Sequence, residues 1–211
     1  MEAVGNILKV QDGRALIIAE INQFLLDKQE IKNCLIRFDD GRTIRAEQRM
    51  KAHAIIRDIA NWNGDYPEYI KEFLKYGYIE ASGEEYFSLA NCSVSTAREF
   101  INYMIDFCFL HNISTRDTML NYTDDIGHYL YSCLYNRKCC VCNEKAEIHH
   151  CEGSRVGMGF NRNKIDNVGR SAIALCRKHH AQAHKFEKEF FKKYHVYGIK
   201  LDEYLVKKLK L

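Results

Sequence analysis

A cluster of cysteines and histidines toward the C-terminal end is the feature that most constrains how this chain can fold. Six of the nine cysteines fall in one short stretch, together with five of the nine histidines. The stretch contains two pairs with two-residue spacing, Cys139-x-x-Cys142 and Cys176-x-x-His179. Both side chains of such a pair can reach one tetrahedral ion, and three cysteines with one histidine form an ordinary structural zinc site. We therefore predict a zinc-clamped subdomain, in which the metal stabilises a loop-rich stretch that has little core of its own.

Two other interpretations of these cysteines stay open. Cys140 can supply the first ligand in place of Cys139, although the usual spacing favours Cys139. The cysteines can also be buried free thiols, which is the ordinary state of scattered cysteines such as Cys34, Cys92 and Cys108. A shared metal is the better interpretation, because the second pair begins 34 residues after the first one ends and completes the ligand set.

The sequence indicates neither a membrane protein nor a secreted one. No apolar run approaches the roughly 20 residues that a membrane-spanning helix needs. The N-terminus lacks the basic start and the small-residue cleavage site of a signal peptide. Nine cysteines are an odd number, so thiols and metal ligands are a better expectation than disulfides. We expect a cytoplasmic protein with no membrane partner.

Charge divides the chain into two unlike parts. Residues 131–211 carry 17 lysines and arginines against 8 acidic residues, a net charge of +9, which leaves −6 for residues 1–130. A polyanion is the natural partner of the basic part, since phosphate contacts release counterions; a solvated basic face is the alternative. The sequence has no linker rich in proline and serine that would mark a domain boundary. We therefore place the boundary near residues 126–137, where the charge changes sign and the region of cysteines and histidines begins, with domains at 1–130 and 131–211.

The spacing of apolar residues predicts an α+β fold. Ile7–Val10 alternates like a strand, a turn follows at Asp12-Gly13, and the spacing over Ala15–Leu26 favours a helix. A second strand is predicted at Cys34–Phe38. The remainder of the first domain is predicted to be mostly helical.

Capping signals and apolar stripes place these helices. The first covers Ala46–Trp62, and its stripe consists of Met50, Ala54, Ile55 and Ile59. Asp65 and Glu68 resemble a capping box for a second helix, from Tyr66 to about Tyr76, which Gly77 is expected to end.

Further signals follow along the chain. After an extended stretch at Tyr86–Leu89, Thr96 and Glu99 indicate the start of a helix. That helix carries Phe100, Met104, Phe107 and Leu110. Another helix is expected to begin near Ser114 and Asp117, and the tail from residue 186 to 211 has helical spacing.

Four histidines outside the predicted zinc site form a second pattern. His180 and His184 are four residues apart, so on a helix that begins near residue 177 they project from one face. His149 and His150 are adjacent, so on a strand they point to opposite sides. One of this pair can bind a metal held by the helix face, which leaves the other for a different role.

The segments IHHCEG and ALCRKHHAQAH resemble the HNH, or ββα-metal, nuclease family, many members of which carry embedded zinc knuckles. The resemblance covers about 48 residues, 138–185. It implies that His149 binds a catalytic metal and that His150 is the general base. It also implies that His180 is a second metal ligand, and His184 matches a further ligand of colicin-like members.

The resemblance further implies an asparagine that holds the connecting loop and orients the base. Asn161, Asn163 and Asn167 all lie in that loop, and we choose Asn167 because it is nearest the return into AIALC. The candidate DNA contacts in the loop, for which a solvated surface is the alternative, are Arg155, Arg162, Lys164 and Arg170.

These residue types suit phosphodiester hydrolysis. A metal that contacts phosphate oxygens stabilises the charge that develops, and a neutral imidazole with a pKa of about 6.5 can take the proton of the attacking water. Imidazole ligands favour Mn²⁺, Ni²⁺ or Zn²⁺ at this site, whereas availability favours Mg²⁺.

Residues 1 to about 125 resemble the phage lambda Orf (NinB) family of recombination mediators. The resemblance lies in the strand, helix and strand of the opening, in GRTIRAEQRMKAHAIIRDIANWNGDYPEYIKEFLK and in SVSTAREFINYMIDFCFLHNIST. It implies a homodimer that binds single-stranded DNA and acts with single-strand-binding protein. The implied strand contacts, for which a solvated helix flank is the alternative, are Arg42, Arg45, Arg49 and Lys51.

Together these patterns predict a phage-encoded HNH endonuclease in the host cytoplasm, acting on single-stranded or branched DNA in recombination or repair. One alternative is a non-catalytic DNA-binding mediator whose zinc module is only structural. The other is a site-specific endonuclease of the restriction or homing kind.

Overall fold

A computed structural model gives the structure of the chain and describes residues 5–21, 23, 41–154 and 166–211. The chain forms two compact units, Met1–Phe38 and Asp39–Leu211. The predicted strand at Cys34–Phe38 lies outside the described residues. Among the helices of the described part, none is long and apolar enough to cross a lipid bilayer.

A β-hairpin forms the described part of the first unit. Strands β1 (Gly5–Gln11) and β2 (Arg14–Ala19) pair antiparallel. The two residues between them, Asp12 and Gly13, have φ angles of 49° and 72°, as a tight two-residue hairpin turn requires. The predicted strand at Ile7–Val10 and the predicted turn are therefore confirmed.

The helix predicted over Ala15–Leu26 is wrong for residues 15–19, which belong to β2. The apolar spacing is compatible with a helix, but Ile17 and Ile18 are β-branched, which favours extended backbone. The preceding turn also returns the segment alongside β1, where its backbone groups pair. Residues 22 and 24–26 lie outside the described part of the chain.

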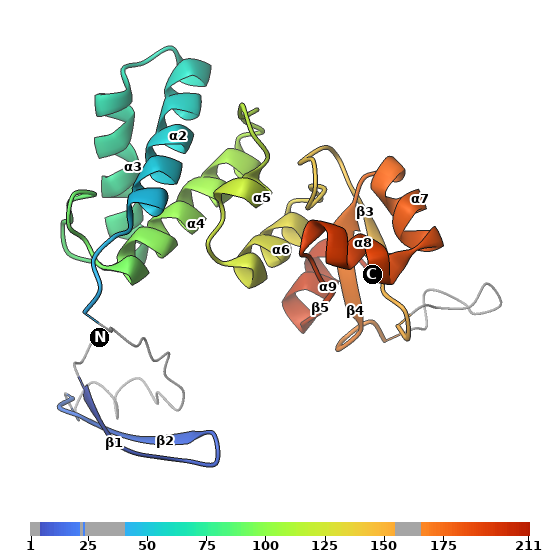
Figure 1. Cartoon of the computed structure of the whole chain (residues 1–211), viewed down its shortest axis with the longest axis horizontal. Coiled ribbons are helices and arrows are strands. Elements are labelled where there is room, and N and C mark those ends of the chain that lie inside the picture. The colour runs from blue at the N-terminus through green and yellow to red at the C-terminus, as the bar shows by residue number, and fades with distance from the viewer. Residues whose placement is uncertain (1–4, 22, 24–40, 155–165) are drawn as a thin grey trace. The chain divides into compact units, whose positions relative to one another are not determined.

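Three long helices open the second unit and pack against one another (Figure 1). They are α2 (Ala46–Asn63), α3 (Pro67–Ser82) and α4 (Val94–Leu110). Gly64 and Gly83 adopt left-handed backbone just after α2 and α3, and the Ser93 hydroxyl accepts the Thr96 N–H at the start of α4. The helix predicted over Ala46–Trp62 is confirmed. The helix predicted from the signal at Thr96 and Glu99 also forms, but it begins at Val94, so Ser93 and not Thr96 is its N-cap.

Gly77 does not end α3, contrary to the prediction. A Cβ at this position would lie 2.3 Å from the Tyr103 hydroxyl of α4. The glycine therefore permits close contact between two helices instead of ending one of them. At the other end, Tyr66 and not Asp65 is the N-cap of α3, and Pro67 takes the first helical position.

Two residues of the predicted apolar stripes face away from the core. Met50 and Leu110 are 66% and 69% exposed, whereas Ile55, Ile59 and Phe100 are buried. A helix turns by about 100° per residue, so Met50 lies nearly opposite the buried isoleucines. The stripe prediction is wrong at these two positions, because the neighbouring helices select which apolar residues are covered.

The segments around α4 are less regular than predicted. The stretch Tyr86–Leu89, predicted to be extended, belongs to no helix or strand, and a turn begins at Leu89. The next helix, α5, spans only Met119–Tyr122, with Thr118 as its N-cap, so it begins later than the signals at Ser114 and Asp117 indicate.

A small sheet surrounded by helices ends the chain (Figure 1). Its antiparallel strands, in the order β3-β4-β5, are β3 (Glu147–His150), β4 (Ser171–Leu175) and β5 (Ile199–Lys200). The helices are α7 (Arg177–Lys185), α8 (Glu187–Tyr194) and α9 (Glu203–Leu209). Hence the predicted helix near residue 177 is confirmed, and the helical tail is two helices interrupted by β5.

Helix α6 (Ile126–Tyr135) connects the helical part to the sheet. It packs against α4 and also against β4, β5 and α9. Four of its side chains have no appreciable exposure: Tyr129, Leu130, Cys133 and Leu134. The predicted domain boundary falls inside this helix, and the division into 1–130 and 131–211 stays a prediction.

Candidate metal centres and active site

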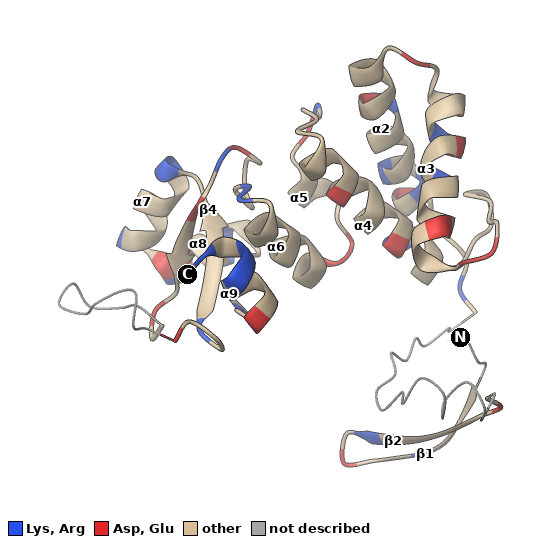
Figure 2. Cartoon of the chain, turned by 180° about the vertical axis from the view of Figure 1, so that it is seen from behind, with Lys and Arg blue, Asp and Glu red and all other residues tan. Residues whose placement is uncertain are grey.

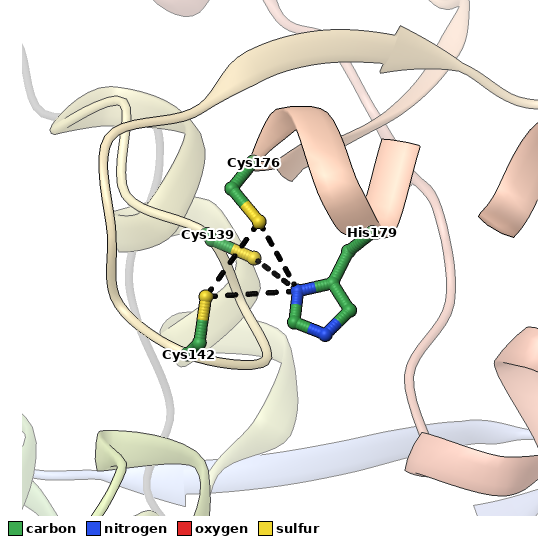
Figure 3. A group of neighbouring side chains, drawn as sticks. All are labelled: Cys139, Cys142, Cys176 and His179. Carbon is green, nitrogen blue, oxygen red and sulfur yellow. Dashed lines mark hydrogen bonds between the residues drawn. The ribbon is translucent and has the colours of Figure 1, made fainter. Parts of the chain in front are cut away.

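The four side chains predicted to bind zinc converge on one point (Figure 3). Cys139 and Cys142 lie in the tight turn before β3, where the Cys139 N–H donates to the Glu144 carbonyl. Cys176 is the N-cap residue of α7, and His179 lies in its first turn. Two side chains from the turn and two from the helix thus face each other.

Their spacing fits one tetrahedral ion. His179 Nδ1 lies 3.3 Å from the sulfurs of both Cys139 and Cys176 and 3.6 Å from that of Cys142. The Cys142 and Cys176 sulfurs are 3.7 Å apart, which excludes a disulfide between them. Ideal zinc–ligand bonds of about 2.3 Å to sulfur and about 2.0 Å to nitrogen place sulfurs about 3.8 Å apart and sulfur and nitrogen about 3.5 Å apart. The donor set therefore fits zinc.

The surroundings lower the pKa values of two of these four side chains, Cys176 and His179. Burial raises the pKa of the Cys176 thiol, but hydrogen bonds from backbone N–H groups and the neighbouring thiols outweigh it, so the net pKa is lowered. Burial, followed by the charges of Lys178 and Lys193, lowers the pKa of His179. Both shifts favour the deprotonated forms that bind metal.

The alternative ligand Cys140 is fully buried and faces elsewhere. Its N–H donates to the Ala174 carbonyl of β4, and its thiol belongs to neither of the two groups of side chains whose ligand atoms cluster in the described part of the chain. The structure thus brings Cys139, not Cys140, to the point where the four ligands meet.

A second cluster consists of His149 from β3 with His180 and His184 from α7. Their ring centroids lie 4.7 to 4.9 Å apart, and one ligand atom from each lies within 4.8 Å of the others. His149 is fully buried, His180 is partly buried and His184 is exposed. The strand and the helix therefore form a three-histidine site that is open on one side.

His149 is oriented by an acidic partner from α8. Its Nε2 lies 2.7 Å from Glu187 Oε1, and Glu187 is itself buried. Because a carboxylate accepts, Nε2 carries the proton, and the lone pair is left on Nδ1. That Nδ1 atom is buried and has no hydrogen-bond partner among the residues that the structure describes. Burial also lowers the pKa of His149. An orphaned, neutral imidazole nitrogen beside two further histidines fits a divalent metal.

His150 lies outside this cluster. It is half-buried and pairs in register with Ala172 of β4, whereas His149 pairs with Ile173. Alternation along β3 thus separates the two adjacent histidines, as predicted.

The predicted loop residues are only partly within the described chain. Asn167 is buried just before β4, and its carbonyl accepts the Arg170 N–H. The Arg170 guanidinium donates to the carbonyls of Asp166 and Ser154, on the two sides of the loop. Arg155, Arg162 and Lys164, like Asn161 and Asn163, lie outside the described residues.

Two acidic residues at the three-histidine site, Glu147 and Glu187, were not predicted from the sequence. Glu147 Oε2 lies 3.0 Å from His180 Nδ1, and strand alternation could have identified this residue, since Glu147 and His149 share one face of β3. No short-range pattern could have identified Glu187, because it contacts His149 from a position 38 residues further along the sequence.

The basic residues predicted as N-terminal DNA contacts have partners within the protein. Arg49 donates to the carbonyls of Leu89 and Ala90. Lys51 pairs with Asp124 at 2.7 Å, and Arg45 lies 3.9 Å from the same carboxylate. Arg42 is exposed. A role of these four residues in binding DNA stays a prediction.

Comparison with known proteins supplies the family. No match to a curated protein or to a solved structure was found. The family model described as "Putative HNHc nuclease" matches residues 17–211, which runs through both predicted domains. Because that match covers far more than half of the 211 residues, the chain belongs to this family of HNHc nucleases.

Proposed function

We propose that the chain is a metal-dependent DNA endonuclease whose active site combines the three-histidine cluster with His150. The observation that carries this proposal is the orphaned, buried Nδ1 of His149 beside His180 and His184. A structural role would leave that nitrogen paired, since an unsatisfied buried polar atom costs about 1–3 kcal/mol. A metal ligand must keep its lone pair available.

In the proposed mechanism, the adjacent histidines of β3 act separately. His149, with His180 and His184, would hold Mg²⁺, Mn²⁺, Ni²⁺ or Zn²⁺, and the bound ion would stabilise the charge that develops on the phosphate. His150, on the other side of the strand, accepts the proton of the attacking water. Asn167 orients His150 by holding the segment just before β4, and the Cys₃His zinc site anchors the start of α7.

Glu187 positions the His149 ligand in this proposal. Its Oε1 fixes the protonated Nε2, while its Oε2 accepts the Glu152 N–H from the loop after β3. A carboxylate behind a metal-binding histidine fixes the ring and raises its basicity. Glu187 therefore acts through His149 and not on the substrate.

Replacing Glu187 with glutamine should weaken binding of the catalytic metal by about 10- to 100-fold while leaving the zinc content unchanged. Glutamine keeps an oxygen that can accept the Glu152 N–H but removes the charge beside His149. A titration with Mn²⁺, monitored by electron paramagnetic resonance of the free ion, measures the affinity of the protein for the metal directly. The matched control is Glu189→Gln, on the exposed side of α8. Equal manganese affinity in both variants would contradict the role of Glu187.

Charge supports DNA as the substrate. The helices around the sheet carry many basic residues (Figure 2). Those on α7, α8 and α9 are Arg177, Lys178, Lys185, Lys188, Lys192, Lys193, Lys207 and Lys208. Lysine and arginine supply the phosphate contacts of nucleic-acid-binding proteins. We further propose that the substrate is single-stranded or branched DNA in phage recombination or repair, and that the protein acts as a homodimer alongside single-strand-binding protein.

A cleavage assay tests the proposed function. The purified full chain is incubated with single-stranded, duplex, flap and four-way DNA, with and without Mg²⁺, Mn²⁺ or Ni²⁺. We expect cleavage that requires added metal and that favours single-stranded or branched substrates. Binding without cleavage under every condition would favour the non-catalytic mediator, and cleavage at one duplex sequence would favour a site-specific endonuclease.

A further inference from the structure

A basic pocket lies between α2 and α3, apart from both metal clusters. Its volume is about 310 Å³, and the segment from Tyr86 to Ala90 closes one side. The side chains of Arg49, Lys71 and Lys75 line it, with His53, and Glu72 is the single carboxylate among the lining residues in the described part of the chain. The pocket therefore has a cationic excess of two charges when His53 is neutral.

Lys75 is the most unusual of these residues, because it is only 3% exposed. Its Nζ lies 3.4 Å from both oxygens of Glu72, which is longer than the roughly 2.7–2.9 Å of a strong charge-assisted hydrogen bond. The same Nζ lies 3.8 Å from the centroid of the Tyr86 ring. A buried ammonium has three protons to donate and loses much of its hydration, so these contacts compensate it only in part.

Glu72 cannot neutralise the pocket alone. It also accepts the Tyr86 hydroxyl at 2.8 Å and lies 3.6 Å from Lys71. Burial raises the pKa of Glu72, but Tyr86 and the two lysines outweigh it, so the carboxylate is charged at neutral pH. Burial and the charges of Lys71, Arg57 and Arg49 lower the pKa of His53, as expected where the potential is positive. The arrangement favours a bound anion.

Exposed aromatic rings stand beside this pocket. Tyr86 is 60% exposed and Tyr76 of α3 is 62% exposed, with ring centroids 6.0 Å apart. Flat exposed rings next to a cationic pocket are the pattern with which proteins bind single-stranded nucleic acid, since bases stack on the rings while cations follow the phosphates. In a duplex the faces of the bases are already stacked on one another, and free phosphate has no base at all. Neither ligand can therefore stack on these rings as single-stranded DNA can.

We propose that this pocket binds a backbone phosphate of single-stranded DNA through Lys75 and Lys71, with the neighbouring base stacked on Tyr86. Arg49, whose guanidinium donates to the carbonyls of Leu89 and Ala90, adds positive charge to the pocket. The inference extends the proposed function, because it assigns single-strand binding to a site on α2 and α3 that takes no part in cleavage. The exposed flank residues Arg42 and Arg45 are not needed for it.

Fluorescence anisotropy of a labelled oligothymidylate with the full chain, without added divalent metal, tests the proposal. Lys75→Met removes the charge and keeps the apolar stem, and Lys71→Gln is a second variant at a partly exposed position. Each should lower affinity and reduce the slope of log affinity against log salt by about 0.7 per lost phosphate contact. Tyr86→Leu should weaken binding about tenfold, the size of one base–aromatic stack.

Matched controls separate the pocket from general charge and aromatic effects. Lys9→Met on β1 makes the same charge change at an exposed position, and Tyr66→Leu removes a ring that is 80% exposed but lies outside the pocket. Circular dichroism confirms that each variant is folded. We expect both controls to bind the oligonucleotide within about twofold of the wild type, in contrast to the single-stack effect of Tyr86→Leu.

Each outcome decides the proposal. Wild-type affinity for Lys75→Met and Lys71→Gln would overturn it. Loss of affinity in the lysine variants but not in Tyr86→Leu, together with competition by inorganic phosphate, would mean a simple anion site and would also overturn it. Cleavage plays no part in the readout, so a chain that binds in this way but never cuts DNA would refute the nuclease proposal alone.

Discussion

Replacing His150 with alanine is expected to reduce the rate of DNA cleavage by about 10²- to 10⁴-fold, the usual contribution of a general base. The reason is that His150 belongs to neither the three-histidine cluster nor the Cys₃His cluster and points to the other side of β3 from His149, so its loss should remove proton transfer without removing a metal ligand. Single-turnover cleavage of labelled DNA measures the rate. Zinc content, metal affinity and DNA affinity of the variant should stay close to those of the wild type.

His180→Ala provides the informative contrast. His180 belongs to the cluster, so this variant should bind the catalytic metal less tightly, and excess Mn²⁺ should restore part of its activity. No metal concentration should restore His150→Ala. If His150→Ala cuts DNA at the wild-type rate, then His150 is not the base, and rescue of both variants by manganese would show that both residues act through the metal.

Loss of the Cys₃His site should have the second large effect. Cys176→Ser is expected to abolish stoichiometric zinc and to lower the thermal midpoint strongly, because structural zinc contributes about 10–16 kcal/mol to the folding of small zinc-finger peptides. In this larger unit the loss should be smaller but still severe, since α7 and the turn at residues 139–142 meet through these ligands. Inductively coupled plasma mass spectrometry and circular dichroism melting measure the two quantities.

Cys92→Ser is the matched control for this prediction. Cys92 is also buried, but it lies outside the cluster, so its replacement makes the same chemical change without removing a zinc ligand. Zinc stoichiometry should stay at one per chain in this control. A Cys176→Ser protein that melts at the wild-type temperature would mean that the four residues do not clamp the fold.

The sequence alone determined the features that depend on short spacing. A two-residue interval brings Cys139 near Cys142, a four-residue interval places His180 and His184 on one helix face, and strand alternation separates His149 from His150. Backbone geometry sets these relations wherever a turn, helix or strand forms. The hairpin turn at Asp12-Gly13 belongs to the same class, because positive φ angles suit these two residues.

Local signals failed where two candidate conformations compete or where a neighbour selects a face. The stretch after residue 14 has helical spacing, yet pairing with β1 makes it a strand. Glycine commonly ends a helix, yet Gly77 lies inside α3, where the Tyr103 side chain approaches too closely for any larger residue. Met50 and Leu110 are apolar, but the helices around them cover other faces of α2 and α4.

Only the tertiary structure decided which distant residues support the sites. Glu187 reaches His149 across 38 residues, and Lys75 is buried because α2, α3 and the segment at residues 86–90 enclose it. No periodicity encodes such pairs, since their distance depends on how whole elements pack and not on the covalent geometry of one segment. The candidate ligands of both metal sites were therefore predictable from the sequence, whereas the carboxylate behind His149 and the basic pocket were not.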